Sequence, residues 1–321
     1  MYKNVNPSLE SNNTRPHSSP KVSVCVVTYN QKEYIKQCLQ SIIDQTTNFH
    51  FEVIVSDDSS TDGTAEIAQS FQSKYPQTIR FFRHEKNIGA SKNYLFAHSL
   101  AKGEYIAHID GDDYALPGKL QIQSDFLDNN PDCIISWHRM LVKSESTGAI
   151  CEDLFDCAHI PPGGFNRSDI LRFITIGSHS SKMYRSAARD FPIPPFPIVD
   201  YFINVEQIGE LRANFISNTP LGVYRAGIGI ASSGLTTRNL LAASFIYFGE
   251  KYPNHRRQIG TATFVLIAAA IKNKNLQVAK IYLSATIRFT RINSILDAIK
   301  YRQIISTLRI PNKIRAQGKT M

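Results

Sequence analysis

Short apolar runs alternate with amphipathic helical patterns between residues 21 and 137, and this alternation restricts the possible folds more than any other feature. Runs typical of buried strands cover residues 22–27, 51–55, 79–82, 105–109 and 133–137. Between them, apolar side chains recur at helical spacing, as at Ile35, Leu39 and Ile42. Strands joined by helices of about twelve residues form crossover connections, which build a mostly parallel sheet with helices on both faces. We therefore predict an α/β fold around such a sheet.

The pattern divides the chain into four segments. Residues 1–20 are rich in Asn, Ser and Pro without periodicity, so we expect a disordered lead-in before an ordered half at 21–143. From 144 to 235 the alternation stops, and loops rich in Gly and Pro separate short elements. From 236 to 321 the pattern is helical. We expect the third segment to be a second half of the domain and the fourth a helical appendage.

Basic residues gather near the C-terminus. The chain carries a formal net charge of +9, and residues 231–321 hold 15 Lys and Arg against 2 Asp and Glu. A basic helical region suits an anionic membrane face or, as an alternative, nucleic acid. No run of about 18 apolar residues predicts a membrane-spanning helix, and the first residues show no secretion signal. The five scattered cysteines fit reduced thiols, so we expect a cytoplasmic protein, peripheral on the inner face of the cell membrane.

Polar segments follow three of the predicted strands. They are Thr28-Tyr29-Asn30, the segment 56–64 with Asp57, Asp58 and Asp62, and Asp110-Gly111-Asp112-Asp113. Because ligands bind beyond the carboxyl ends of parallel strands, we expect these segments to meet at one sheet edge. Six carboxylates packed there without a cation would raise one another's pKa. A divalent cation relieves the repulsion, and oxygen ligands that also bind phosphate favour Mg²⁺ or Mn²⁺.

Other interpretations of these motifs stay open at this level. The segment 57–62 could form only a turn and a helix cap. It also resembles a calcium loop, although position twelve is Gln69 instead of Glu. An acidic segment after a strand is also a feature of haloacid-type phosphatases. Cys151, Cys157 and His159 could hold a metal, but their spacing matches no zinc pattern.

Residues 21–137 resemble the family 2 glycosyltransferases of the GT-A fold, and a fainter similarity continues to about residue 235. The resemblance rests on five segments in the right order and spacing, namely residues 24–30, 57–64, 87–93, 103–106 and 110–113. One of these segments alone would be a weak signal, and the five together are a strong one. The resemblance implies a nucleotide-sugar-binding fold in which the DXD-type motif Asp110-Gly111-Asp112 lies at the donor.

The resemblance also implies where the nucleotide part of the donor binds. Thr28, Tyr29 and Asn30 would line the base pocket at the end of the first strand. Asp58 would accept a hydrogen bond from the imide nitrogen of uracil or thymine. This preference indicates a UDP or TDP sugar as the donor.

The resemblance places the diphosphate and its metal ion at the acidic motif. Asp110 would face the ribose and the metal shell, and Asp112 would bind the metal that bridges the diphosphate. Such an ion neutralises charge that builds on the leaving group. Lys92 would help to hold the donor, although a helix-surface lysine is an equal alternative.

The catalytic base is expected in the second half. An inverting transfer needs a carboxylate that takes the acceptor proton as the hydroxyl attacks the anomeric carbon. In the family an acidic pair at a helix start supplies it, and Val199-Asp200 stands in that place. We therefore expect Asp200 to be the base, with a simple helix cap as the alternative. His179 is expected to be structural, with a catalytic or binding role as the alternative.

These expectations combine into an inverting, metal-dependent glycosyltransferase that builds a surface glycan on a glycan or lipid-linked acceptor. A sugar nucleotidyltransferase is an alternative, but it needs a glycine-rich phosphate loop after the first strand. The segment from Thr28 to Gln31 contains no glycine. A catalytically inactive nucleotide-sugar-binding member is a second alternative. A nucleic-acid partner is not expected, because the predicted site is acidic.

Overall fold

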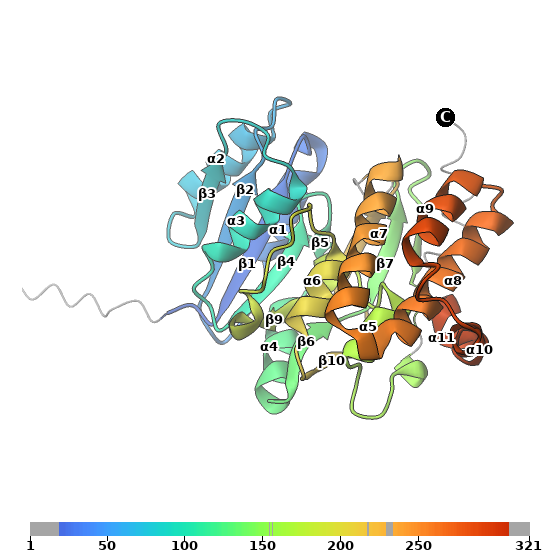
Figure 1. The fold of residues 1–321 in the computed structure, drawn as a ribbon. Coiled ribbons are helices and arrows are strands. Elements are labelled where there is room, and N and C mark those ends of the chain that lie inside the picture. Colours follow the sequence, from blue (N-terminus) through green and yellow to red (C-terminus); the bar gives the residue numbers. More distant parts are fainter. Residues whose placement is uncertain (1–18, 154, 156, 217, 229–233, 308–321) are drawn as a thin grey trace, which may run out of the picture.

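The computed structural model describes residues 19–307, except 154, 156, 217 and 229–233. The predicted disordered lead-in at 1–20 lies almost entirely outside the described residues. A central sheet occupies one side of the molecule, and a layer formed by the C-terminal helices lies against the other (Figure 1). The predicted α/β architecture with a helical appendage is confirmed.

The main sheet contains the five predicted strands and two short ones from the second half. They are β1 (Val22–Thr28), β2 (Phe51–Asp57), β3 (Ile79–Arg83), β4 (Tyr105–Asp110), β6 (Cys133–Trp137), β9 (Met183–Arg185) and β10 (Arg212–Phe215). Their order across the sheet is β10-β6-β9-β4-β1-β2-β3. β1 pairs in parallel with both β2 and β4, whereas β9 runs antiparallel between β4 and β6. The sheet is therefore mostly parallel, as predicted.

Successive residues of β1 enter two different hydrophobic cores. Val24 and Val26 pack with residues of α1 (Lys32–Ile43), α2 (Thr64–Lys74) and α4 (Lys119–Asn129). Cys25 points to the opposite face, where it packs with residues of α3 (Ala90–Ser99). Both faces are buried, which is why apolar side chains point to both faces of the strand, and Ser23, a polar residue within it, is buried and donates to Glu52.

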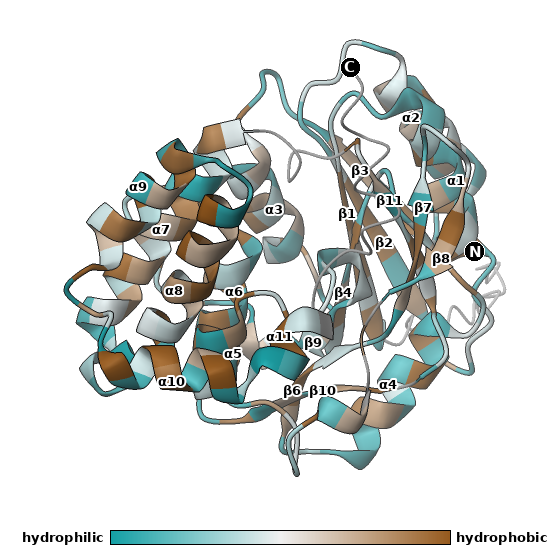
Figure 2. Cartoon of the chain, turned by 90° about the vertical axis from the view of Figure 1, so that its right-hand side faces the viewer, coloured by the Kyte–Doolittle hydropathy of each residue, from teal (hydrophilic) through white to brown (hydrophobic). Residues whose placement is uncertain are grey.

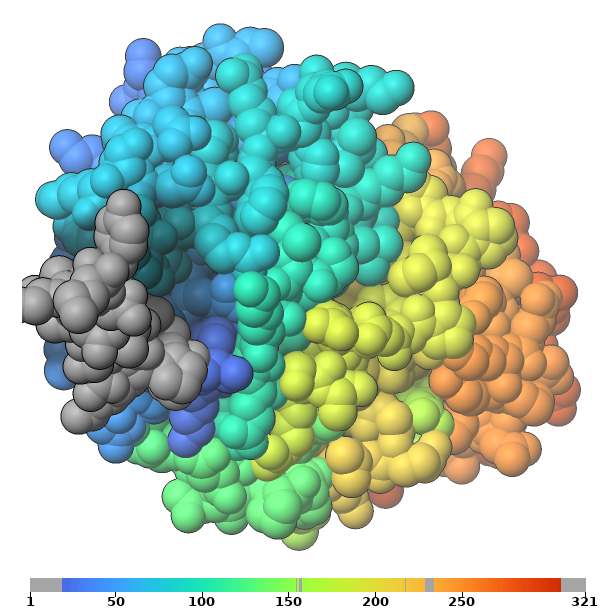
Figure 3. All heavy atoms as spheres, turned by 90° about the vertical axis from the view of Figure 1, so that its left-hand side faces the viewer, coloured from blue at the N-terminus to red at the C-terminus, as the bar shows by residue number. Residues whose placement is uncertain are grey.

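A second sheet, which the sequence pattern did not predict, packs beside the acidic segment 110–113. Its strands are β5 (Tyr114–Ala115), β11 (Gly222–Ala226), β7 (Met140–Ser144) and β8 (Ile150–Glu152), in that order. These strands have two to five residues, and all but β5 lie after residue 137, where strands and helices no longer alternate, so periodicity gave no signal for the sheet. Residues 186–199 lie on the surface beside α3 (Figure 3), where the backbone N–H of Ile198 donates to Ser91 Oγ.

The helical layer comprises α7 (Gly234–Lys251), α8 (Arg256–Lys272), α9 (Leu276–Thr286), α10 (Ile292–Lys300) and α11 (Arg302–Thr307). It packs on α5 (Arg167–Phe173) and on α6 (Asp200–Gln207) through aromatic rings. Phe202 of α6 stacks on Phe248 of α7 with ring centroids 4.9 Å apart. Figure 2 looks directly onto this layer. No helix in the described residues has both the length and the hydrophobicity needed to cross a bilayer.

Candidate active site

The acidic segment forms a tight turn at the end of β4, directly against the end of β1. Asp110 lies beside Val27 in the parallel register. A Cβ atom at Gly111 would come within 2.5 Å of Gln31 Oε1 and 2.9 Å of Thr28 Cβ. Only glycine lets the turn approach this closely, which explains the residue between the two aspartates. The structure therefore brings Thr28 and Asp110 together, as the sequence predicted.

Asp112 and Asp113 are buried in this turn, with exposed fractions of 6% and 1%. Burial, and after it the charge of Asp110, raises the pKa of Asp112 to about 7. Burial and the charges of its two acidic neighbours raise the pKa of Asp113 well above its ordinary value. The turn thus concentrates negative charge that a cation or donor groups must offset.

Arg225 on β11 supplies part of that compensation. Its backbone N–H donates to Asp113 Oδ1 at 2.9 Å, and its guanidinium donates to the backbone carbonyl of Asp112 at 2.5 Å. The same group pairs with Glu145 at 2.9 Å and lies between the rings of Tyr34 and Tyr114. Because Arg225 fixes the backbone of the turn from a different sheet, it sets the position of the two carboxylates.

Asp200 is the first residue of α6, as predicted, and it lies next to His179. His179 belongs to a 3-10 turn at residues His179–Ser181, and its Nδ1 is 3.4 Å from Asp200 Oδ1. The surrounding protein, and after it the charge of Asp110, raises the pKa of Asp200, although its side chain is 61% exposed. The N-cap residue of α6 is Val199, and no side chain caps the helix. The carboxylate of Asp200 is therefore not the N-cap of its own helix.

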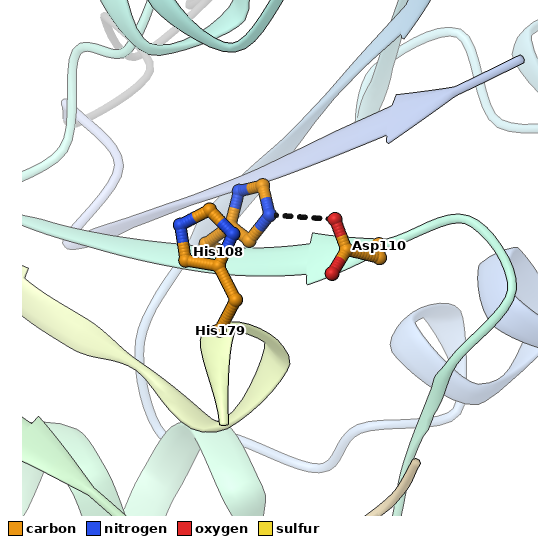
Figure 4. Close-up of side chains that lie close together, drawn as sticks. All are labelled: His108, Asp110 and His179. Atoms are coloured by element: carbon orange, nitrogen blue, oxygen red, sulfur yellow. Dashed lines mark hydrogen bonds and ion pairs between the residues drawn. The ribbon is translucent and has the colours of Figure 1, made fainter. Parts of the chain in front are cut away.

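A chain of buried imidazoles lies behind Asp110. His108 Nε2 is 3.1 Å from Asp110 Oδ1, and His108 Nδ1 is 3.0 Å from His98 Nε2. The other nitrogen of His98 is 2.8 Å from the hydroxyl of Tyr184. The His179 ring lies 3.9 Å from the His108 ring, beside Asp110 (Figure 4). Since His179 also contacts Asp200, the imidazoles connect Asp110 to Asp200. Burial lowers the pKa of His98 and His179 well below the ordinary value, so both are neutral.

The acidic segment 57–62 does not contribute all of its carboxylates to the cluster of six that we predicted. Asp57 accepts hydrogen bonds from the backbone and hydroxyl of Ser60. Asp62 accepts from the backbone N–H of Thr64 and from that of Lys32, at the first turns of α2 and α1. These two aspartates therefore close turns and cap helices, because backbone donors lie within reach of each oxygen. The mutually repelling group is smaller and consists of Asp110, Asp112, Asp113 and Asp200.

The remaining predicted donor residues lie at the ends of β1 and β2. Asp58 is 2% exposed, and its oxygens accept the backbone N–H groups of Ile88 and Gly89 at 2.7 and 3.0 Å. Hydrogen bonds of this kind hold a carboxylate rigidly. Tyr29 is 42% exposed. The roles of these residues toward a nucleotide base stay predictions.

Asn30 and Lys92 occupy less specific positions. Asn30 has a left-handed backbone with φ of 51°, and its side chain accepts from the backbone N–H of Thr61. It therefore joins the loops that follow β1 and β2. Lys92 is exposed on α3. Contact of either side chain with a donor stays a prediction.

The arrangement at Asp110 fits a divalent cation. His108, Asp110 and His179 each offer a ligand atom, and these atoms lie within 4.8 Å of one another. His179 Nε2 is buried and has no hydrogen-bond partner among the described residues. Asp112, the predicted ligand, is not in this group. Carboxylate oxygens with an imidazole nitrogen suit Mn²⁺ better than Mg²⁺, because Mg²⁺ takes oxygen ligands.

Several residues of the site were missed by sequence reasoning. His108 carried the clearest signal, because it stands two residues before Asp110 on a strand and thus on the same face. Arg225 was noticed only as a faint part of the family resemblance. Tyr184 of strand β9 was likewise only part of the fainter resemblance, and His98 of helix α3 carried no signal.

Comparison with a protein-family model identifies the family to which this chain belongs. The model described as glycosyl transferase family 2 matches residues 23–186, which is half of the chain and includes the acidic turn, His108 and His179. The chain belongs to this family. The predicted resemblance is confirmed.

Relatives in this family are alike over part of their length. An uncharacterised protein of Mycobacterium tuberculosis is 32% identical over 223 residues, which are 68% of this chain and 62% of that protein. A putative teichuronic acid biosynthesis glycosyltransferase of Bacillus subtilis is 38% identical over 108 residues, which are 34% of this chain and 42% of the relative. The chain thus spans less than two thirds of these relatives.

Solved structures share the fold at low sequence identity. Residues 1–349 of S. aureus TarS, in complex with UDP-GlcNAc, match with a TM-score of 0.63 and 19% identity over 90% of this chain and 89% of that one. The mannosyltransferase PcManGT of Pyrobaculum calidifontis, in complex with GDP-Man and Mn²⁺, matches with a TM-score of 0.50 and 16% identity over 91% and 85%. The GT-A fold is therefore confirmed.

Proposed function

We propose that this family 2 member is an inverting, metal-dependent glycosyltransferase that moves a sugar from a UDP or TDP sugar to an acceptor hydroxyl. The observation that carries the proposal is the link between the acidic turn and the candidate base. Asp110 lies 3.1 Å from His108 and Asp200 lies 3.4 Å from His179, and the rings of the two histidines are in contact, tilted by 31°. We propose that the first of these carboxylates binds the leaving diphosphate through a cation and that the second takes the acceptor proton, so that the two histidines connect the groups that act on the two sides of the reaction.

Asp200 acts on the acceptor. Its carboxylate takes the proton of the acceptor hydroxyl as the hydroxyl oxygen bonds to the anomeric carbon. At the same time the bond from that carbon to the diphosphate oxygen breaks, and the nucleoside diphosphate leaves with the electron pair. Attack from the side opposite the leaving group inverts the anomeric configuration. The raised pKa of Asp200 brings it nearer to neutral pH, which suits a general base.

Asp110 and His179, two of the three residues whose ligand atoms lie together, would hold the cation, and Asp112 would be the further ligand that the family resemblance implies. A bound Mn²⁺ or Mg²⁺ would neutralise charge on the diphosphate. Arg225 holds the turn in place from β11, and Gly111 lets the turn reach Thr28. The metal in the complex of PcManGT supports a cation in this fold, and the UDP-GlcNAc in that of TarS supports a uridine donor.

The acceptor is proposed to be a glycan or a lipid-linked glycan of the cell surface. The similarity to a protein named for teichuronic acid biosynthesis supports this class. The reaction would take place in the cytoplasm, at the inner face of the cell membrane, where nucleotide sugars are available.

Calorimetric titration with UDP, TDP, GDP and ADP, each with and without Mn²⁺, tests the proposal. We expect binding of UDP or TDP that depends on Mn²⁺ and that the Asp112→Ala variant loses. The Asp190→Ala variant is the matched control, since Asp190 is exposed and pairs only locally with Arg189. No binding of any nucleotide by the unaltered protein would overturn the proposed function. Binding without sugar transfer to any acceptor would indicate an inactive member instead.

A further inference from the structure

Helix α10 is amphipathic, but its apolar face is exposed and its polar face is buried. Ile292, Leu296 and Ile299 are 68%, 55% and 54% exposed, and their spacing places them on one face. The opposite face is polar and buried. Ser294 Oγ donates to the carbonyl of Arg257, and the Asp297 carboxylate accepts two hydrogen bonds from the Arg257 guanidinium at 2.6 and 2.7 Å. The helix therefore turns its apolar side away from the protein core.

Helix α9, which also packs on α8, carries a second exposed apolar face. Leu276, Leu283 and Ile287 are 64%, 47% and 65% exposed and also share one face. Ile271, at the end of α8, is 55% exposed. Figure 2 shows hydrophobic residues along α8, α9 and α10 in the layer that faces the viewer. Single exposed apolar residues are ordinary, but a group of large aliphatic side chains on neighbouring helices marks a binding surface.

Unpaired basic residues accompany the apolar ones. Lys280 lies on the exposed face of α9, four residues after Leu276, and Arg291 and Lys300 are exposed at the two ends of α10. None of these three forms an ion pair within the part of the chain that the structure describes. The two acidic residues after position 230 are already paired, Glu250 with Arg288 and Asp297 with Arg257. The surface thus presents apolar side chains among uncompensated positive charge.

Charge also argues against the other occupants of this surface. A second copy of the chain would bring an equally basic layer against it. The C-terminal segment 308–321 holds Arg309, Lys313, Arg315 and Lys319 and no acidic residue, so it too would be repelled. An anionic lipid surface, by contrast, offers negative headgroups to the lysines and arginines and an acyl boundary to the isoleucines and leucines.

We propose that the exposed faces of α9 and α10 form a membrane-docking surface that binds anionic lipid, with the apolar side chains entering the headgroup boundary. The docking surface consists of Leu276, Lys280, Leu283, Ile287, Ile292, Leu296 and Ile299 with Arg291 and Lys300. Docking lies outside the catalytic chemistry, since none of these residues belongs to the acidic turn. It would hold the enzyme where a lipid-linked acceptor is embedded.

Vesicle flotation of the full chain tests the docking surface without any donor or turnover. Its failure is therefore distinct from a failure of glycosyl transfer. We expect the protein to float with phosphatidylcholine vesicles that contain about 30% phosphatidylglycerol, and not with phosphatidylcholine alone. Changing Ile292, Leu296 and Ile299 together to Ser should weaken binding at least about tenfold. Changing Lys280, Arg291 and Lys300 together to Gln should weaken it about a hundredfold and remove most of its salt dependence.

Matched variants control for general changes of surface. Ile150 and Ile193 are 53% and 55% exposed but lie outside the helical layer, and their change to Ser should leave binding intact. Changing the exposed Lys36, Lys74 and Lys86 to Gln should do the same. Equal flotation of the apolar triple variant and the unaltered protein would overturn the proposal. So would a dimer in sedimentation velocity that this variant dissociates, or loss of binding only when the basic residues of 308–321 are changed.

Discussion

Replacing Arg225 by methionine tests how the acidic turn is held. Methionine keeps the length of the side chain but removes the guanidinium. The change deletes the hydrogen bond to the Asp112 carbonyl at 2.5 Å, the hydrogen bond to Gln37 and the ion pair with Glu145 at 2.9 Å. The side chain of Arg225 is only 3% exposed, so water cannot replace these partners without rearrangement.

The loss of stability in Arg225→Met depends on which partners of Arg225 are left without a hydrogen bond or ion pair. Removing one partner of a buried, hydrogen-bonded ion pair destabilises a protein by about 3–5 kcal/mol. Glu145 is 24% exposed and recovers part of its solvation, so we expect the lower end, about 3 kcal/mol. Stacking between Tyr34 and Tyr114 adds to the loss. Arg225→Lys keeps the charge but not the planar fork and should lose about half as much.

Urea denaturation and UDP titration with Mn²⁺ measure the two consequences together. We expect Arg225→Met to lower the free energy of unfolding and to weaken Mn²⁺-dependent UDP binding at least about tenfold, since a shifted turn misplaces Asp112. Arg139→Met is the control, because Arg139 forms ion pairs with Glu152 and Asp153, away from the acidic turn. It should lose stability yet bind UDP normally. If Arg225→Met bound UDP as the unaltered protein does, Arg225 would not position the turn.

Three further predictions concern the base, the metal ligand and a buried lysine. Asp200→Asn should lower kcat by about 10²–10⁴ while the Kd for the donor stays unchanged, and Asp190→Asn should leave both unchanged; loss of donor binding by Asp200→Asn would mean that another residue is the base. Asp112→Ala should abolish turnover and Mn²⁺-dependent donor binding while circular dichroism shows an intact fold, and retained turnover would refute the metal role. Burial lowers the pKa of Lys119 to about 7 from an ordinary value near 10.5, so the folded state binds fewer protons than the unfolded chain between these pH values and stability rises with pH there. From pH 7 to 10, the free energy of unfolding of Lys119→Met should therefore rise less steeply than that of the unaltered protein, by up to about 1.4 kcal/mol per pH unit. An equal slope in both proteins would show that the three hydrogen-bond acceptors of Lys119, which include His138, keep this lysine charged in the folded state.

The sequence by itself determined five of the seven strands of the main sheet and the place of the acidic turn. Five apolar runs alternate with helical patterns, and parallel strands must end at the same edge of a sheet. Asp110 and Asp112 therefore had to lie near Thr28. The start of α6 at Asp200 followed in the same way from local periodicity and from the family resemblance.

Only the tertiary structure decided which groups surround that turn. Arg225 reaches Asp113 from 112 residues away in the chain, and His98 reaches His108 from a helix on one face of the sheet. Contacts between distant segments depend on how sheets and helices pack, and no local pattern encodes them. The same cause applies to Asp62, which accepts the backbone N–H of Lys32 from 30 residues away, whereas Asp57 is held locally by Ser60 in its own loop.

Helix α10 shows most clearly what apolar periodicity in a sequence can and cannot predict. Its apolar periodicity was visible in the sequence at Ile292, Leu296 and Ile299, and such a stripe normally faces a core. The structure turns that stripe outward and instead buries Asp297, which pairs with the exposed Arg257. Periodicity determines which side chains share a face of a helix. Which face meets the protein depends on the partners that the rest of the chain provides.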